Sequence, residues 1–141
     1  MKVPTSGRVA PRRIELDPVC VIREGDEEYC IYPLDRVMTV LGKKWTLFVT
    51  AVLGNREQTR FNELLAELRF ISSRTLTDRL KELVALRLVE REESQEAPHR
   101  VAYSLTSHGR ALRRRLIPLL DWAIGFEADV GHSVPAPAEA A

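Results

Sequence analysis

Residues 60–105 read RFNELLAELRFISSRTLTDRLKELVALRLVEREESQEAPHRVAYSL, and this stretch of the sequence decides the fold. Two segments in it, residues 62–68 and 73–85, space their leucines as the buried face of an amphipathic helix requires. Asn62 and Ser72 stand at the beginnings of these segments, and both side chains can cap a helix. We therefore expect two short helices joined by a tight turn.

A β-hairpin is expected directly after the second helix. Residues 88–92 and 100–105 favour strands, and the polar residues 94–99 form the loop between them. Arg60 and Phe61 are expected to add a short third strand. Helix, turn, helix and hairpin in this order are typical of a winged helix-turn-helix, in which the hairpin loop is the wing. The predicted fold class is mainly α with a small antiparallel β-sheet (α+β).

The second helix is expected to present a polar face to solvent. Leu76, Leu80 and Leu83 define its apolar face, and Arg74 and Asp78 point in the opposite direction. Cationic and hydroxyl side chains in such a row can reach phosphates and base edges in the DNA major groove. Because many surface helices have a polar face, the hairpin that follows is what favours DNA. The predicted DNA contacts are Ser72, Ser73, Arg74, Thr75, Thr77, Asp78 and Lys81 on this helix, His99 and Arg100 in the wing, and Lys43 and Lys44 at the start of an earlier helix.

The composition favours one cytoplasmic domain. The chain has 141 residues, and its formal net charge of +1 argues against a uniformly basic, histone-like binder. Charge is unevenly placed, because residues 97–120 contain five arginines and no acid. These arginines are either a solvated helix face or part of a nucleic-acid surface. No apolar run approaches the roughly 18 residues that a membrane-spanning helix needs, so we expect no membrane association.

The residues do not favour an enzyme. The sequence has no glycine-rich phosphate loop, no Gly-x-Ser-x-Gly elbow and no His-Glu-x-x-His motif. Its two cysteines and three histidines lack the spacing of metal ligands. We expect neither catalysis nor a cofactor nor a metal site.

Three regions are expected along the chain. Residues 1–29 form an N-terminal extension with a basic tail and a β-hairpin, and residues 131–141 form a flexible C-terminal tail. Residues 30–130 form the winged helix-turn-helix domain together with helices for dimerisation. In the extension, a three-residue hairpin tip at residues 24–26 would pair Arg23 with Glu27 and set Cys20 opposite Cys30.

Two further helices and a long C-terminal one complete the domain. Apolar spacing predicts a helix that has Pro33 in its first turn and ends at Gly42, and a second helix from about Lys43 to Leu53. The long helix, capped by Thr106, carries two apolar stripes, and one small core does not readily cover both. The alternatives are a fully internal helix or packing against a second copy of the chain. The predicted dimer interface comprises Leu34, Val37, Met38, Leu116, Leu119, Leu120, Ala123 and Phe126.

Several segments together resemble the HxlR-type winged helix-turn-helix regulators, relatives of the MarR regulators. They are LGKKWTL at 41–47, RFNEL at 60–64, ISSRTLTDRLKEL at 71–83 and VAYSLT at 101–106 followed by Gly109, and they span roughly residues 30–126. The resemblance implies a homodimeric transcriptional regulator, with Arg74 on the recognition helix and Arg100 at the wing. The sequence departs from the family pattern at Arg69-Phe70, where a Pro-Gly-like turn is common, and in its longer N-terminal leader.

The resemblance also bears on the cysteines. Family members typically carry a cysteine just ahead of the first helix, and in some of them it senses oxidants or electrophiles; Cys30 is placed about there. Either both cysteines are small, partly buried apolar residues, or Cys30 is a thiol switch. In the second case oxidation would join Cys30 to Cys20 or to a cysteine of the partner chain.

Taken together, the residues and the resemblance predict a sequence-specific regulator that binds double-stranded DNA. We expect a repressor that acts as a homodimer on an inverted-repeat operator. Its effector is unknown, and thiol oxidation is the candidate signal if Cys30 is a switch. The alternative is a winged-helix module that binds another protein, because Glu92, Glu93 and Glu96 crowd the wing and would repel phosphate.

Overall fold

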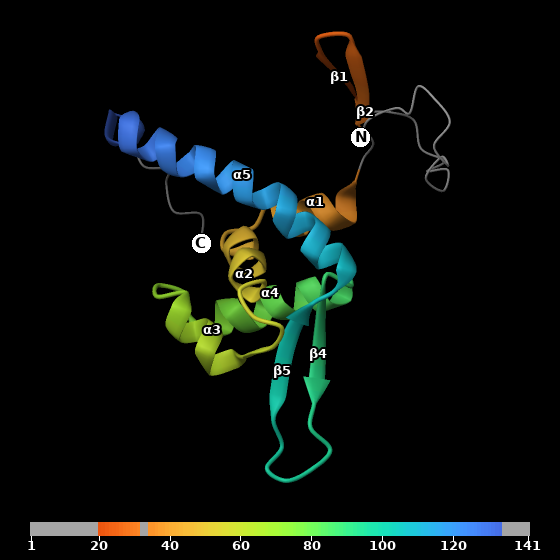
Figure 1. Ribbon diagram of the computed structural model, residues 1–141, viewed down its shortest axis with the longest axis vertical. Helices are drawn as coiled ribbons and strands as arrows, with labels where there is room; N and C mark the ends of the chain where they lie inside the picture. Colours follow the sequence, from red (N-terminus) through yellow and green to blue (C-terminus); the bar gives the residue numbers. More distant parts are fainter. Residues whose placement is uncertain (1–19, 32–33, 134–141) are drawn as a thin grey trace. The chain divides into compact units, whose positions relative to one another are not determined.

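The structure, a computed structural model, describes residues 20–31 and 34–133 (Figure 1). The expected basic tail, Pro33 and residues 134–141 of the expected C-terminal tail lie outside the described residues. The chain divides into two compact units, Met1–Met38 and Thr39–Ala141. Its elements are β1 (Cys20–Glu24), β2 (Glu27–Ile31), α1 (Asp35–Leu41), α2 (Thr46–Leu53), β3 (Thr59–Arg60), α3 (Phe61–Glu67), α4 (Ser73–Ala85), β4 (Val89–Glu93), β5 (Val101–Leu105), α5 (Ser107–Asp129) and the 3₁₀ turn η1 (Gly131–Ser133).

Strands β1 and β2 form the hairpin expected in the N-terminal extension, but its register differs from the prediction. The tip contains two residues rather than three and begins at Gly25, whose φ of +58° glycine adopts at no steric cost. The pairing therefore moves by one position along one strand. Cys30 pairs with Val21, and Cys20 pairs with Ile31. The predicted cross-strand pair of cysteines is wrong.

Helix α2 begins later than the sequence suggested. Trp45, directly before it, has φ +78°, a left-handed conformation that no regular helix contains. The next residue, Thr46, is fully buried, and its hydroxyl donates a hydrogen bond of 2.8 Å to the carbonyl oxygen of Val40. This hydrogen bond holds the turn between α1 and α2. Lys43 and Lys44 lie in that turn, so their predicted place at the start of a helix is wrong.

A short third strand is present, but it comprises Thr59 and Arg60, whereas Phe61, which was predicted to belong to it, is the first residue of α3. Arg60 pairs with Ala102 of β5 and keeps an extended backbone, so the helix starts at the following residue. The carboxylate of Glu63 accepts a hydrogen bond of 3.1 Å from the backbone N–H of Arg60. Asn62 therefore lies within α3 and does not cap it, in contrast to the prediction.

One apolar core joins α2, α3, α4 and the three-stranded sheet. The leucines that gave α4 its predicted apolar face are all buried, and they pack with leucines and valines of the neighbouring elements. The buried core residues are Val49, Leu53, Leu64, Leu68, Ile71, Leu76, Leu80, Leu83, Leu88, Val89 and Leu105. Burial of these side chains fixes the orientation of α4, and thereby decides which of its residues face solvent.

The sheet has the strand order β3-β5-β4, and the β4–β5 hairpin projects from the helices (Figure 1). Its antiparallel register runs from the pair Val89–Leu105 to the pair Glu93–Val101. Beyond the strands, the N–H of Ser94 donates to the carbonyl oxygen of Arg100 at 2.8 Å. The predicted hairpin is confirmed.

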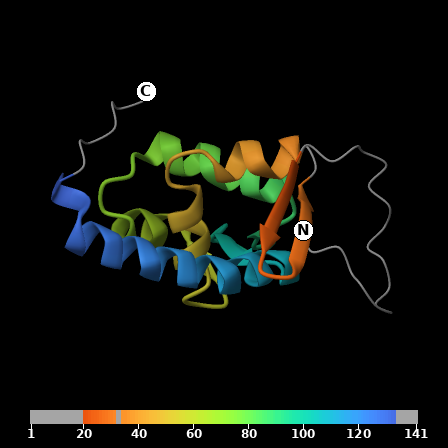
Figure 2. The same ribbon diagram turned by 90° about the horizontal axis from the view of Figure 1, so that it is seen from above.

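Helix α5 begins at its predicted cap. The hydroxyl of Thr106 accepts a hydrogen bond of 3.1 Å from the N–H of Gly109, and it donates one of 2.7 Å to the carbonyl oxygen of Arg87. The helix continues through Pro118 over 23 residues. Among the described residues, no helix combines the length and the hydropathy that crossing a membrane requires. In Figure 2, α2 lies between α4 on one side and α5 on the other.

Candidate nucleic-acid interface

Helix α4 is fixed at its N-terminus by the predicted cap. The Ser72 hydroxyl accepts a hydrogen bond of 3.0 Å from the N–H of Thr75 and donates one of 2.8 Å to the hydroxyl of that residue. Three leucines anchor the opposite face, and each is at most 1% exposed. The helix is therefore held at its end and along one side. Its remaining side chains stand on a rigid support.

The exposed face of α4 carries the residues predicted to contact DNA. Ser73, Arg74, Asp78 and Lys81 are exposed, and Thr75 and Thr77 are half-buried. The Thr77 hydroxyl donates 2.8 Å to the carbonyl oxygen of Ser73, which leaves it able only to accept from another group. Thr75 already accepts from Ser72, and its own proton remains available for donation. Cationic, acidic and hydroxyl groups thus occur together on one helix face.

Lys43 lies beside α4, although it is far from this helix in sequence. Its ammonium group lies 2.9 Å from a carboxylate oxygen of Glu82, which also accepts from Arg79 at 3.1 Å. Lys43 is therefore partly neutralised by an acid of α4. Lys44 instead lies over the ring of Trp45, with 5.8 Å between its nitrogen and the ring centroid. The sequence prediction joined the two lysines in one phosphate-binding role, and the structure gives them different surroundings.

The wing exposes His99 and Arg100 at its tip. The loop is ordered by a hydrogen bond of 3.2 Å between the His99 ring and the carbonyl oxygen of Ser94. Two of its acids are engaged within the hairpin or beside it. Gln58 donates to Glu92 at 3.0 Å, and Arg91 pairs with Glu93 at 2.9 Å.

Arg91 is a wing residue that the sequence reasoning missed. It is exposed on β4, and its hydrogen bond to Glu93, followed by one to Tyr103, raises its pKa above the ordinary arginine value. A guanidinium is in any case charged at every physiological pH. The available signal in the sequence was a single arginine among the glutamates of β4. Alternate residues of a strand face the same side, so Arg91 and Glu93 share one face.

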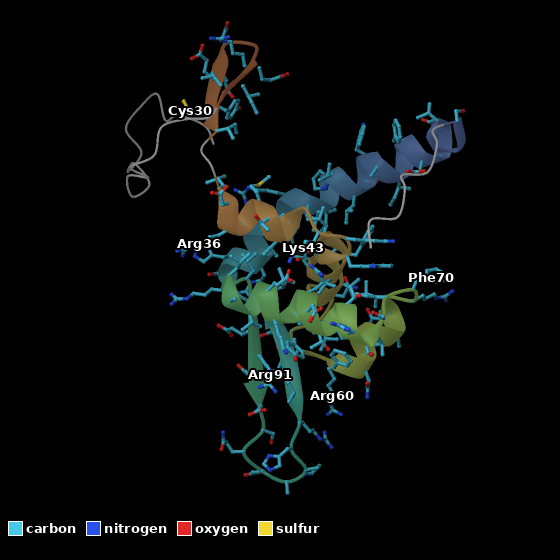
Figure 3. All side chains as sticks on the ribbon, turned by 180° about the vertical axis from the view of Figure 1, so that it is seen from behind. Cys30, Arg36, Lys43, Arg60, Phe70 and Arg91 are labelled. Atoms are coloured by element: carbon cyan, nitrogen blue, oxygen red, sulfur yellow. The ribbon has the colours of Figure 1, made fainter. Side chains whose placement is uncertain are left out.

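Phe70 was also missed as a candidate. It lies in the turn between α3 and α4, and 90% of it is exposed. Figure 3 labels it at the end of that turn, with Lys43 near α4 and Arg91 on the wing strand. A phenyl ring left in solvent two residues before the helix cap does not contribute to the core. The unusual dipeptide Arg69-Phe70 was visible in the sequence, but nothing there indicated how exposed the ring would be.

Within residues 20–31 and 34–133, no group of three His, Cys, Asp or Glu side chains is arranged to hold a metal ion. The exposed groups of α4 and the wing can form hydrogen bonds and ion pairs with a large polar partner.

Comparison with known proteins agrees with this geometry. The sequence model of the family described as HxlR-like helix-turn-helix matches residues 40–129. The chain belongs to the HxlR-like helix-turn-helix family.

Relatives of this HxlR-family chain include regulators of known structure. The HTH-type transcriptional regulator YodB of Bacillus subtilis is 34% identical over 93 residues, which are 66% of this chain and 82% of YodB. A possible HxlR family transcriptional factor from Thermoplasma volcanium superposes with a TM-score of 0.70 at 36% identity, over 78% of this chain and 98% of that one. The redox regulator HypR, in its reduced form, gives a TM-score of 0.63 at 32% identity, over 72% and 99%.

Membership of the HxlR-like family identifies the fold as a winged helix-turn-helix and the protein as a DNA-binding transcription regulator. In this architecture α4 is the recognition helix, and the β4–β5 hairpin is the wing. The predicted fold class and the expected family are confirmed.

This HxlR-family chain also exposes large apolar side chains on α5. Ile124 is 70% exposed and Trp122 is 63% exposed, and the Trp122 ring stacks on Phe126 with 5.4 Å between centroids. Leu116, which was predicted to lie at a dimer interface, is only 3% exposed, so almost none of its surface is available to a partner. The other predicted interface residues are exposed or half-buried: Leu119, Leu120, Ala123 and Phe126 on α5, Val37 and Met38 on α1, and Leu34 directly before α1.

Proposed function

We propose that this regulator is a homodimeric repressor that binds an inverted-repeat operator. The observation that carries the proposal is the exposed face of α4, where a capped and leucine-anchored helix presents Arg74, Asp78 and Lys81 together. In a two-fold symmetric dimer, two such helices would enter successive major grooves about 34 Å apart. The two half-sites would then be inverted copies of one sequence.

Each exposed residue of α4 has a role that follows from its chemistry. Arg74 can donate two parallel hydrogen bonds to a guanine edge, and Lys81 can contact a guanine or a phosphate. Asp78 can accept from the amino group of cytosine but is repelled by phosphate, so it would act in selectivity. Ser72 and Ser73 lie at the N-terminus of the helix, where N–H groups and hydroxyls meet a phosphate. The hydroxyl of Thr75 would donate a hydrogen bond to the DNA, and the hydroxyl of Thr77 would accept one.

The wing would contact the adjacent backbone or minor groove. Arg100 and His99 are exposed at its tip, and they offer cationic or donor groups. The acids that argued for a protein-binding module are partly engaged, because Glu92 accepts from Gln58 and Glu93 pairs with Arg91. This engagement reduces their repulsion of phosphate and supports the DNA-binding role of the wing. Lys44, in the turn before α2, would add a phosphate contact.

A homodimer would cover the apolar surface of α5. Soluble monomers rarely leave several large apolar residues exposed together on one element. Trp122, Ile124 and Leu119 are all more than half exposed in the single chain. Pairing of α5 with its symmetry mate would bury them, and Leu34, directly before α1, with Val37 and Met38 of α1 would extend the interface.

A DNA-binding experiment with a salt titration tests the proposal. The purified protein would first select fragments from its own genome, and fluorescence anisotropy would then measure its affinity for the selected duplex. A dimer that neutralises several phosphates should lose affinity steeply as salt increases, with a slope of about −0.9 per phosphate contact. Light scattering should give the mass of two chains. If the protein selected no genomic fragment, or bound DNA weakly and with no dependence on salt, the protein-binding module would be favoured instead.

Thiol oxidation is proposed as one regulatory input. Structures of YodB in reduced and diamide-treated forms, and of HypR in reduced and oxidised forms, show that these relatives were studied in two redox states. In this chain Cys30 is half-buried on β2. Oxidation would join the thiol of Cys30 to a cysteine of a partner chain, because Cys20 and Cys30 of one chain are not register partners. The two thiols would transfer two electrons and two protons to an oxidant. A disulfide here would alter the segment just ahead of α1.

A further inference from the structure

A pocket of about 570 Å³ opens between the end of α2, the loop that follows it and the first half of α5. Its volume lies within the range of about 300–1,000 Å³ that small-molecule sites occupy. Arg56, Arg110, Arg113 and Arg114 line it, and Glu57 is the one carboxylate among its described lining residues. None of the residues that line this pocket belongs to the proposed DNA-binding surface.

Arg113 is built into the wall of the pocket. Its Nε donates a hydrogen bond of 2.7 Å to the carbonyl oxygen of Ala51, and its terminal nitrogen donates one of 2.9 Å to the side chain of Asn55. The glycine at position 54 makes room for this arrangement, because a Cβ there would lie 2.0 Å from Cδ of Arg113. The guanidinium therefore closes the C-terminal end of α2 and remains fixed. A fixed cation loses little freedom when it binds a ligand.

The positive charge of the pocket is only partly compensated by acids. Arg56 pairs with Glu63 and Glu67, but in the part of the chain that the structure describes, no carboxylate lies within ion-pair distance of the other three arginines. Arg110 donates to the carbonyl oxygen of Leu105 at 2.8 Å and keeps further N–H groups available. Guanidinium groups in such a cluster are suited to oxyanions, which accept two parallel hydrogen bonds from each.

The position of the pocket favours a small anion over a DNA phosphate. The pocket lies where α2 meets α5, and α4 lies on the other side of α2 (Figure 2). A duplex held by the exposed face of α4 would therefore not cover these arginines. A concave wall also suits a compact ligand.

We infer that this pocket binds a small organic anion that carries two or more carboxylate or phosphate groups. Arg110 and Arg114, both on α5, would form hydrogen-bonded ion pairs with the ligand, and Arg113 would contribute a guanidinium whose position is already fixed. The inference goes beyond the proposed operator binding, since it concerns a second ligand at a separate surface.

Isothermal titration calorimetry of the full chain tests it, with citrate as the carboxylate probe and pyrophosphate as the phosphate probe. Each titration is made at constant ionic strength, so that general salt effects are the same throughout. We expect saturable binding of at least one probe, and the probe that binds identifies the oxyanion class. DNA is absent from this measurement, so its failure is distinguishable from failure of the proposed operator binding.

Two variants of neighbouring arginines make the test specific. Arg114 lines the pocket, is exposed and makes no hydrogen bond in the described structure, so Arg114→Gln should leave the fold intact and weaken binding about tenfold. Arg115 is one residue further along the same helix but does not line the pocket, and its side chain bonds to the carbonyl oxygen of Ala111. Arg115→Gln should bind the probe as the wild type does. Thermal melting of both variants checks folding.

Two results would overturn the inference. One is the absence of saturable binding of both probes. The other is equal weakening by Arg114→Gln and Arg115→Gln, which would indicate a diffuse attraction of anions to α5. If Arg114→Gln instead lowered affinity for the operator and its salt slope while no probe bound, the arginines would contact DNA, and the pocket would not be a small-anion site.

Discussion

The α-carbon of Gly109 lies directly against the carbonyl oxygen of Leu88. A Cβ at position 109 would be 2.0 Å from that oxygen, where no side chain fits. The same oxygen accepts a hydrogen bond of 3.1 Å from the N–H of Thr106. The first turn of α5 is thus joined to the segment that begins the wing through backbone groups, and these cannot move aside as a flexible side chain would.

Gly109→Ala should therefore lower the free energy of unfolding by about 3 kcal/mol, because the backbone must shift to admit a methyl group. Urea unfolding followed by circular dichroism at one fixed protein concentration measures the change. Gly125→Ala, in the same helix, is the matched control, since nothing lies within 4 Å of a Cβ there. It should raise stability by about 0.5–1 kcal/mol. Equal stability of Gly109→Ala and the wild type would contradict the close approach.

The cap of the recognition helix gives a second stability prediction. Ser72→Ala removes the acceptor of the Thr75 N–H and should cost about 1 kcal/mol. Ser73→Ala changes the next residue, which is exposed and whose side chain is not a cap, so its stability should stay within about 0.5 kcal/mol of the wild type. Both are measured by the same urea titration. A Ser73→Ala variant less stable than Ser72→Ala would mean that the helix begins elsewhere.

The sequence predicted the helices and strands whose signals are local. Leucines at helical spacing together with a hydroxyl cap were enough for α4 and for the start of α5 at Thr106. The β4–β5 hairpin followed from alternation between two turn-rich segments. These features depend on residues within one or two turns of each other, so no knowledge of the tertiary structure was needed.

Predictions failed where a distant residue decides the local structure. The start of α3 depends on the pairing of Arg60 with Ala102, which is the last pair of β3, so the helix begins at Phe61, earlier than the predicted cap at Asn62. The place of Lys43 depends on Glu82, 39 residues away. The N-terminal hairpin failed for a different reason, because tips of two and three residues differ by a single position and both suited residues 24–27.

The interface residues were predicted only in part. Periodicity identified α5 as a helix with more apolar surface than one core can cover, and the exposure of its far half agrees with that reasoning. It could not distinguish Leu116, which the chain itself buries, from Trp122 and Ile124, which it leaves exposed. Helical spacing gives the direction of a side chain, but not the extent to which neighbouring elements cover it.

Substitutions at the two cationic residues of α4 should have different effects on DNA binding. Arg74→Ala should weaken operator binding by about 1–3 kcal/mol and relax the sequence preference at one base pair. Lys81→Ala, if Lys81 contacts a phosphate, should weaken binding similarly on all sequences and reduce the salt slope by about 1. Anisotropy titrations on the operator and on a scrambled duplex distinguish the two. Unchanged affinity of Arg74→Ala would remove it from the recognition surface.

Oxidation should affect DNA binding through Cys30. Diamide should lower the operator affinity of the wild type, and dithiothreitol should restore it, because a disulfide forms and is then reduced. Cys30→Ser should be insensitive to diamide. Cys20→Ser separates two pairings between chains: it should stay sensitive to diamide if Cys30 joins its counterpart in the partner, and should be insensitive if Cys30 joins the partner's Cys20. If the wild type and Cys30→Ser bound equally well with and without diamide, the thiol switch would be excluded.

The apolar face of α5 predicts how the dimer can be separated. Trp122→Glu places a charge on a side chain that is 63% exposed in the single chain, so the monomer fold should be unaffected. If a partner covers this face, burial of the unpaired carboxylate should raise the dimer dissociation constant by at least about tenfold. Analytical ultracentrifugation over a range of concentrations measures the constant, with Asp121→Asn as the control on the neighbouring exposed residue. A Trp122→Glu chain that stays as dimeric as the wild type would show that the interface lies on another surface. The two-fold axis that relates the two α4 helices would then pass through that other surface.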